Sequence, residues 1–230
     1  MTNSTRSHRP ASRLRPARPA LLAGLALLAL GAETLGAAAL AQTNLRSTFP
    51  GRRIGGGTRG ECTARLLAHL VPANSVFAPG ASRTLGLLEG PVANPRPLLL
   101  EFRPLSSGGS ADKASSTRVS RDLPAAPAGV TLITLAAGTS ASTVWESSYR
   151  CGLDGAAAAD PLAFVEAAAP PALSLVVSDV TAADKASQAA LARLRAACGS
   201  AVPRQEVAQA FGLADVINAD WPAQLPVRCL

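Results

Sequence analysis

The clearest pattern in this chain of 230 residues is Thr143-Val144-Trp145-Glu146-Ser147-Ser148-Tyr149-Arg150-Cys151. Successive residues alternate between two faces, and the aromatic residues share the face that would meet a core. The first face carries Thr143, Trp145, Ser147, Tyr149 and Cys151, and the second carries Glu146, Ser148 and Arg150. A period of two residues, with residue types that favour extended backbone, predicts a β-strand.

Further β-prone runs lie on both sides of this strand and are separated by Pro and Gly turn signals. They comprise residues 66–71, 84–88, 98–103, 130–135 and 173–177. Such short strands predict a sandwich-like, β-rich domain over residues 60–177, with a flexible Ser/Gly/Ala/Pro-rich connection at 104–129. For residues 62–71 periodicity alone leaves helix and strand open, because Cys62, Leu66 and Leu70 also share a helical face.

Residues 178–230 show a helical pattern instead. The first expected helix runs to about residue 197 and the second ends near residue 212. Their signals are Asp179 or Thr181 as a cap and Gly199 as a stop for the first helix, and Pro203 and Gly212 for the second. The sequence therefore predicts a mostly β fold followed by a small two-helix C-terminal segment.

Residues 1–41 have the pattern of a secretory signal peptide. A basic region with five arginines precedes a Leu/Ala run at 21–30, and Ala39-Leu40-Ala41 resembles a cleavage site. The alternative is an uncleaved membrane anchor, but an apolar run of about ten residues falls well short of the roughly 20 that span a bilayer. The sequence predicts cleavage after Ala41, no membrane span after cleavage, and a periplasmic or extracellular location.

Removal of this segment changes the charge of the chain. The whole sequence has 22 basic and 15 acidic residues, and residues 42–230 keep 17 and 14, which is a net charge of +3. Aromatic residues make up 3% of the chain, so platforms for stacking bases are scarce. Both features argue against nucleic acid as a partner.

All four cysteines lie after the expected cleavage site, and an even number in an exported chain predicts two disulfides. Sequential pairing, Cys62 with Cys151 and Cys198 with Cys229, keeps each bridge within one zone of composition. The nested alternative, in which Cys62 pairs with Cys229 and Cys151 with Cys198, stays open because chain entropy does not exclude it.

A Gly/Arg-rich lead-in occupies residues 42–59 and contains Arg52, Arg53 and Arg59. These arginines could contact an anion together with backbone N–H groups of the glycine loop. They could instead pair with nearby carboxylates such as Glu61 and tie the lead-in to the sheet, which is the commoner arrangement for arginine.

The motif Pro50-Gly51-Arg52-Arg53-x-Gly55-Gly56-Gly57-Thr58-Arg59, followed by Cys62 and by Leu70-Val71-Pro72, resembles the opening of a domain-of-unknown-function family of secreted cyanobacterial proteins. The aromatic strand that ends at Cys151 and, loosely, residues 211–217 are similar to that family as well. The resemblance implies export and a β-rich core, and it favours a strand at residues 66–71. That family has no established activity, cofactor or catalytic residue.

Sequence motifs point to no catalytic, cofactor-binding or metal-binding residue. His69 is the single histidine after residue 41 and is expected, on the strand interpretation, to face solvent with Arg65. Paired carboxylates have no spacing signature. The candidates for such a pair are Glu61, Glu89, Glu101 and Glu146, all expected to be solvated.

The sequence therefore predicts an exported, non-enzymatic domain that acts by interaction with an envelope protein or an anionic glycan. The alternative is a carboxylate-based hydrolase that acts on a cell-envelope glycan. Two facing carboxylates in a cleft would favour the enzyme, and a flat surface with the Gly/Arg loop exposed would favour binding.

Overall fold

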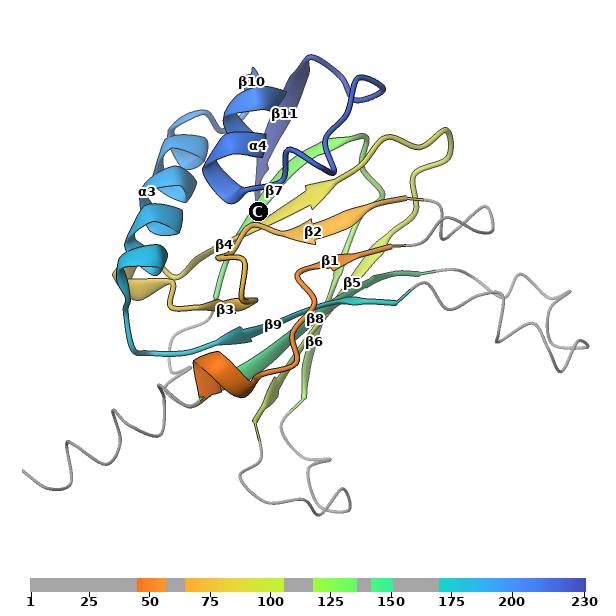
Figure 1. Ribbon diagram of the computed structural model, residues 1–230. Helices are drawn as coiled ribbons and strands as arrows, with labels where there is room; N and C mark the ends of the chain where they lie inside the picture. The colour runs from red at the N-terminus through yellow and green to blue at the C-terminus, as the bar shows by residue number, and fades with distance from the viewer. Residues whose placement is uncertain (1–44, 57–64, 106–117, 136–141, 151–169) are drawn as a thin grey trace, which may run out of the picture. The chain divides into compact units, whose positions relative to one another are not determined.

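A computed structural model describes residues 45–56, 65–105, 118–135, 142–150 and 170–230 (Figure 1). The chain divides into two units, residues 1–41 and 42–230, and every described residue belongs to the second. Within that unit the fold is mostly β, with two mixed sheets and small helices, as the sequence predicts.

The first sheet has six strands in the order β1-β2-β4-β7-β11-β10. Neighbours in it are antiparallel except β7 and β11, which run parallel. Their bounds are β1 Ile54–Gly55, β2 Leu67–His69, β4 Thr84–Glu89, β7 Gly129–Thr134, β10 Ala201–Pro203 and β11 Gln224–Cys229.

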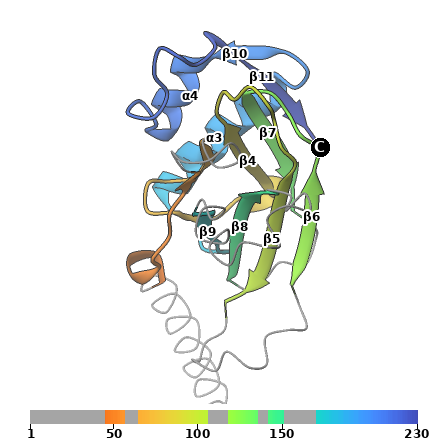
Figure 2. The ribbon, with the colours of Figure 1, turned by 90° about the vertical axis from the view of Figure 1, so that its right-hand side faces the viewer.

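The second sheet has five strands in the order β3-β9-β8-β5-β6, and Figure 2 shows β9, β8, β5 and β6 side by side. Only β3 and β9 are parallel among these neighbours. Their bounds are β3 Val76–Phe77, β5 Leu98–Pro104, β6 Val119–Leu123, β8 Thr143–Tyr149 and β9 Ala172–Val176.

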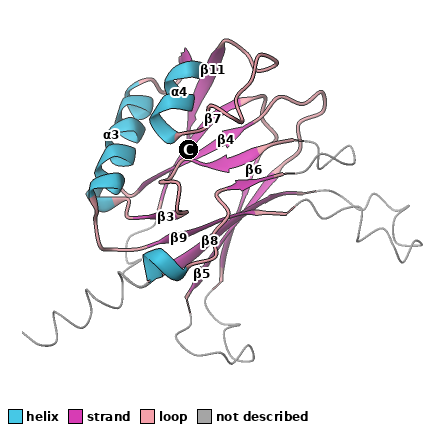
Figure 3. Cartoon of the chain, in the orientation of Figure 1, coloured by secondary structure: helices cyan, strands magenta, loops and turns pink. Residues whose placement is uncertain are grey.

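The six-stranded sheet is covered on both faces. Helix α3, Ala182–Ala196, lies against one face of the six-stranded sheet (Figure 3). It packs on β4, where a Cβ on Gly86 would approach Leu191 Cδ2 to 2.6 Å. The opposite face of the sheet meets β8 and β9, because the side chain of His69 in β2 contacts both strands. Strand β4 is buried along its whole length, as expected for a strand between two layers.

Both expected helices are present. Helix α3 begins with a capping box, in which the Thr181 side chain accepts from Asp184 N and the Asp184 carboxylate accepts from Thr181 N. Helix α4, Arg204–Phe211, ends at Gly212, whose φ of 58° is the left-handed conformation that glycine adopts without strain.

The C-terminal segment contributes more than helices. Strands β10 and β11 extend the first sheet, and β11 lies between β7 and β10. The connection expected to be flexible at 104–129 also contains a strand, β6, which pairs with β5 over five residues. Strand β6 was missed because it is polar, with only Val119 and Leu123 as apolar residues. Strand β10 has three residues, and β11 was missed because Pro226 interrupts its apolar alternation.

Residues 45–55 connect the two sheets. Arg52 forms an isolated bridge with Leu173 of β9, and the next residues continue into β1, which pairs with β2. At the start of this segment Arg46 Nη2 donates to Asp184 Oδ2 at 2.8 Å, and the Asp184 side chain is fully buried. The segment is therefore held to both sheets and to the start of α3.

The disulfide Cys198–Cys229 joins the residues after α3 to the end of β11, with a Cα–Cα distance of 5.8 Å. This is one of the two predicted bridges, and it rules out the nested pairing, which needs Cys229 for Cys62. Cys62 and Cys151 lie outside the described residues, so their pairing stays a prediction. A disulfide is compatible with an oxidising compartment.

Candidate functional site

The first candidate is a polar cluster between the two sheets, which we call the histidine cluster: His69, Trp145, Ser147 and Ser174. All four residues are fully buried. His69 Nδ1 lies 2.8 Å from Ser174 Oγ, and Nε2 lies 2.9 Å from Ser147 Oγ. The imidazole also stacks on Trp145, with ring centroids 3.5 Å apart and an interplanar angle of 7°.

Burial lowers the pKa of His69 well below its usual value. The imidazole is therefore neutral at pH 7, with both ring nitrogens engaged by serine hydroxyls. This corrects the expectation that His69 and Arg65 face solvent, since both are buried. The expectation was wrong because a second sheet covers the face of β2 that the alternation assigned to water.

The chemistry of the histidine cluster favours a structural role. A histidine beside two serines resembles a nucleophile and its base, but an attacking hydroxyl must reach a substrate. Here Ser147 and Ser174 have no exposed surface, and neither does the imidazole between them. The arrangement links β2 to β8 and β9 through hydrogen bonds that satisfy buried polar groups.

We expect the stability of the protein to depend on pH through His69. The unfolded chain binds a proton near pH 6.5 and the folded chain only at lower pH, so stability is fully present above about pH 6.5. It falls as the pH drops, by up to about 1.4 kcal/mol per pH unit. Urea unfolding followed by tryptophan fluorescence at pH 7.5, 6.5 and 5.5 measures this slope.

The matched variant is His69→Gln, which keeps a hydrogen-bonding side chain without a titrating ring. Its stability should be lower at pH 7.5 and should change less between pH 7.5 and 5.5. Burial raises the pKa of Glu89 and gives a pH dependence of opposite sign, but that contribution is common to both proteins and cancels in their difference. Equal slopes would contradict a buried neutral histidine.

A second cluster, which we call the charge cluster, lies in the space between the sheets at the end of β4. Its members are Arg65, Glu89, Thr131, Tyr149 and Arg228, which come from five segments that are distant in sequence. Arg65 Nη1 lies 3.1 Å from Glu89 Oε2, and Arg228 Nη2 lies 3.3 Å from Glu89 Oε1. Thr131 donates to the same Oε1, and Arg65 lies over the Tyr149 ring, 5.3 Å from its centroid.

Most of the charge cluster is shielded from solvent. Arg65 is 2% exposed, Glu89 3% and Arg228 25%. Burial raises the pKa of Glu89, and attraction to Arg65 and Arg228 offsets part of that rise. Burial likewise lowers the pKa of Arg228, and Glu89 opposes the shift. The expectation that Glu89 is solvated was wrong, because its strand is buried on both faces.

The remaining candidate carboxylates lie elsewhere. Glu101 in β5 is directly opposite Glu146 in β8, and both side chains are on the outer face of the five-stranded sheet. Arg118 Nη1 donates to Glu101 Oε1 at 3.0 Å. Both glutamates are partly buried rather than fully solvated. Glu61 lies outside the described residues.

The arginines of the lead-in do not form one site in the part of the chain that the structure describes. Arg53 donates to the carbonyl oxygens of Val71, Phe211 and Gly212, which attaches the lead-in to the end of α4. This is the tying role that the sequence left open, with carbonyl groups in place of carboxylates. Arg52 is exposed, and Arg59 lies outside the described ranges.

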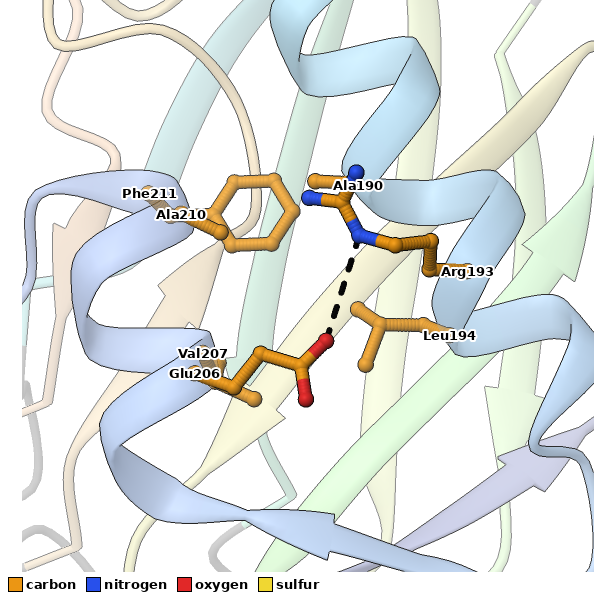
Figure 4. A pocket seen from close by; sticks show the side chains of 7 residues that line it. All are labelled: Ala190, Arg193, Leu194, Glu206, Val207, Ala210 and Phe211. Atoms are coloured by element: carbon orange, nitrogen blue, oxygen red, sulfur yellow. Dashed lines mark ion pairs between the residues drawn. The ribbon is translucent and has the colours of Figure 1, made fainter.

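Two of the cavities lined by described residues are too small for a ligand. One lies between α3 and α4, where Arg193 Nε and Glu206 Oε1 are 3.9 Å apart, and has a volume of about 10 Å³ (Figure 4). The other, of about 30 Å³, lies beside Arg195 and Leu230. These volumes suit a water molecule or two, whereas ligand pockets are about 300–1,000 Å³.

No group of three or more His, Cys, Asp or Glu side chains among the described residues is placed to hold a metal ion. None of the helices in that part of the chain combines the length and the apolar character needed to cross a bilayer.

The accessible polar surface of the five-stranded sheet is the third candidate. Outer-face residues of β5, β6 and β8 include Glu101, Arg103, Ser120, Asp122, Glu146 and Ser148. Strand β6 is outermost, and its first four residues are exposed, including Val119 at 61%. One edge of β6 pairs with β5, and no described strand pairs with the other edge.

Sequence reasoning missed most members of both clusters, namely Arg65, Thr131, Ser147, Ser174 and Arg228, as polar partners. One signal was available: Leu85, Leu87 and Leu88 of β4 are apolar on both faces, which is typical of a strand covered on both sides. A neighbour of such a strand buries its polar face as well, and a buried histidine or arginine then needs partners.

Family models, curated proteins and solved structures were compared with this chain, and none of them matches it.

Proposed function

We propose that the protein is an exported binding domain that engages its partner through the free edge of β6 and the adjoining outer face of the five-stranded sheet. One observation carries the proposal: β6 is an exposed strand of five residues with backbone groups on one edge that no described strand uses. An extended segment of another chain can add to such an edge by main-chain hydrogen bonds.

Export is the second part of the proposal. The basic region, the Leu/Ala run and Ala39-Leu40-Ala41 support a signal peptide, and the Cys198–Cys229 disulfide is compatible with an oxidising compartment. The resemblance to the secreted cyanobacterial family supports the same location. A periplasmic or extracellular site gives the β6 edge access to envelope proteins and to anionic glycans.

The buried clusters support a role in binding rather than in chemistry. The histidine, the serines and Glu89, which would serve as base, nucleophile or acid, are engaged with one another or with arginines between the sheets. The outer face carries acidic and basic side chains in direct contact, such as Arg150 Nε and Asp122 Oδ1 at 2.5 Å. Mixed charges of this kind are common at the rim of protein interfaces.

A hydrolase remains the second candidate because Glu101 and Glu146 are cross-strand neighbours. Side chains directly opposite on a sheet have Cβ atoms about 4.5–5.5 Å apart, so two such glutamates can reach the carboxyl separation of about 5–5.5 Å that a retaining glycosidase needs. Incubation with purified peptidoglycan tests it. Release of soluble fragments that is abolished by Glu101→Gln and by Glu146→Gln would favour the hydrolase.

The binding proposal is tested by a photoreactive amino acid at position 120, in the centre of β6, in the intact envelope. We expect covalent adducts from position 120 and far fewer from position 185, which is exposed on α3. Far-ultraviolet circular dichroism checks that both variants fold. Equal yields of adducts at the two positions, or none at position 120, would refute the proposal.

A further inference from the structure

We propose that the β6 edge binds a second copy of this chain, so that two five-stranded sheets join into one continuous sheet about a two-fold axis at Ser120. The inference rests on the proposed function, since it names the partner of the same edge. This partner is supported by the register of charges along β6, by the length of the strand and by the short, proline-containing or two-residue strands at the other sheet edges.

The charges on β6 complement themselves in antiparallel pairing. When Ser120 lies opposite Ser120 of the second copy, Arg118 lies opposite Asp122, and the axis repeats this pair. Residues 118, 120 and 122 alternate with 119 and 121, so all three share the outer face with Glu101, the partner of Ser120 on β5. Opposite charges directly across a strand pair are stabilising, and like charges are destabilising.

The same register also covers an exposed apolar residue, Val119. Val119 is 61% exposed, the highest value among the large hydrophobic residues of the described chain. Self-pairing places Val119 opposite Arg121 of the second copy, whose aliphatic stem can cover it. If the second copy were shifted by one residue, so that Val119 lay opposite Asp122, both Arg118–Asp122 ion pairs would be lost. Charge therefore selects the register with Ser120 opposite Ser120.

The other sheet edges offer less. Strands β1 and β3 have two residues each, and β10 has three, one of which is Pro203. Very short strands and proline are usual protections of an edge. Strand β6 has five residues and no proline, so it is the longest of the four terminal strands of the two sheets.

Existing contacts of the charged residues do not prevent pairing. Arg118 contacts Glu101 and Asp122 contacts Arg150, with side-chain exposures of 58% for Arg118 and 61% for Asp122. Exposed pairs of this kind contribute little to stability, so their side chains are free to add or exchange partners. A carboxylate also has room for a second donor.

Strand addition over five residues makes a small interface, below the roughly 1,200 Å² of a standard stable complex, so the association should be weak. Sedimentation velocity of the purified protein from micromolar to several hundred micromolar should show a reversible monomer–dimer equilibrium. Arg118→Glu and Asp122→Arg should each weaken it by about tenfold, because symmetry repeats every like-charge contact. The double variant Arg118→Glu/Asp122→Arg should restore it.

Two controls separate the edge from its supporting contacts. Glu101→Gln and Arg150→Gln remove the partners of Arg118 and Asp122 within one chain, and each variant should weaken the association far less than Arg118→Glu or Asp122→Arg. In a second measurement, Ser120→Cys should give a disulfide-linked dimer on mild oxidation, because paired residues of antiparallel strands have Cα atoms about 4.5–5.5 Å apart. Ser148→Cys, on the outer face of β8, should stay monomeric.

The outcomes distinguish the two proposals. Self-pairing would be overturned by a purified protein that is monomeric at every concentration. It would also be overturned by a dimer whose association is unchanged in Arg118→Glu and Asp122→Arg. If position 120 still gives adducts with another protein in the envelope, the binding function stands with a different partner. Loss of association without rescue in the double variant, together with no Ser120→Cys dimer, would overturn the proposed register.

Discussion

Replacement of Glu89 by alanine should lower the free energy of unfolding by about 3–5 kcal/mol, because it leaves two guanidinium groups in the charge cluster without their carboxylate. Arg65 is 2% exposed and cannot move into water without opening the space between the sheets. Arg65 Nη2 and Arg228 Nη1 already have no hydrogen-bond partner among the described residues. No neighbouring acceptor in that part of the chain is therefore placed to replace the Glu89 carboxylate. Urea unfolding monitored by tryptophan fluorescence measures the change.

The matched control is Glu101→Ala, which removes the partner of Arg118, an arginine 58% exposed. Its cost should stay below about 1 kcal/mol, as for other ion pairs near water. A third variant, Glu89→Gln, keeps the size and hydrogen-bonding groups and removes the charge, so it should lie close to Glu89→Ala. A cost below about 1 kcal/mol for both Glu89 variants would show that the charge cluster does not stabilise the fold.

Removal of the Cys198–Cys229 disulfide should cost about 3.7 kcal/mol, from the chain-entropy model for a loop of 31 residues. The double variant Cys198→Ser/Cys229→Ser avoids a free thiol. The loss should loosen the first sheet in particular, because Cys229 is the last residue of β11 and pairs with Leu132 of β7. Thermal unfolding of the double variant beside the wild type measures the effect.

A change below about 1 kcal/mol in that double variant would contradict the entropic account of the bridge. Peptide mapping without reduction should recover a fragment that links residues 198 and 229. The same map tests the second predicted bridge, which should appear as a fragment linking Cys62 to Cys151. Tyr149 and Leu66, which flank these two cysteines in the described chain, are joined by a hydrogen bond of 3.2 Å.

Local signals predicted much of the fold. Strand β8 follows the alternation from Thr143, and α3 begins at the expected cap Thr181. Helix α4 ends at Gly212 as its conformation requires. Each of these features depends on residues within a few positions of one another, so a single sequence carries the information.

Features that depend on distant parts of the chain were not predicted. Strand β11 contains Pro226, which argues against a central strand. The structure accommodates it because the parallel pairing with β7 begins only at Val227. Likewise β6 is polar because one edge and most of its surface are exposed, so it has no apolar face to read.

The same limit applies to the candidate sites. The solvent-facing prediction for His69 followed correctly from alternation in one sheet, but the partners Ser147 and Ser174 belong to the other sheet. No periodicity in one strand reports which layer covers it. The symmetric placement of Arg118 and Asp122 around Ser120, by contrast, is visible in the sequence. It suggests self-pairing only once the structure shows that β6 lies at a sheet edge.

Hydrogen–deuterium exchange of the β6 amides at different protein concentrations tests the central claim, that this edge is a binding surface, most directly. Alternate amides of β6 donate to β5, and the others point to the free edge. As the concentration rises from micromolar to several hundred micromolar, the edge-facing amides of Val119–Leu123 should gain protection while those of β10, Ala201–Pro203, stay unchanged. Equal exchange of the β6 amides at all concentrations would contradict strand addition between two copies, and equal exchange in the presence of envelope extract as well would contradict the binding function.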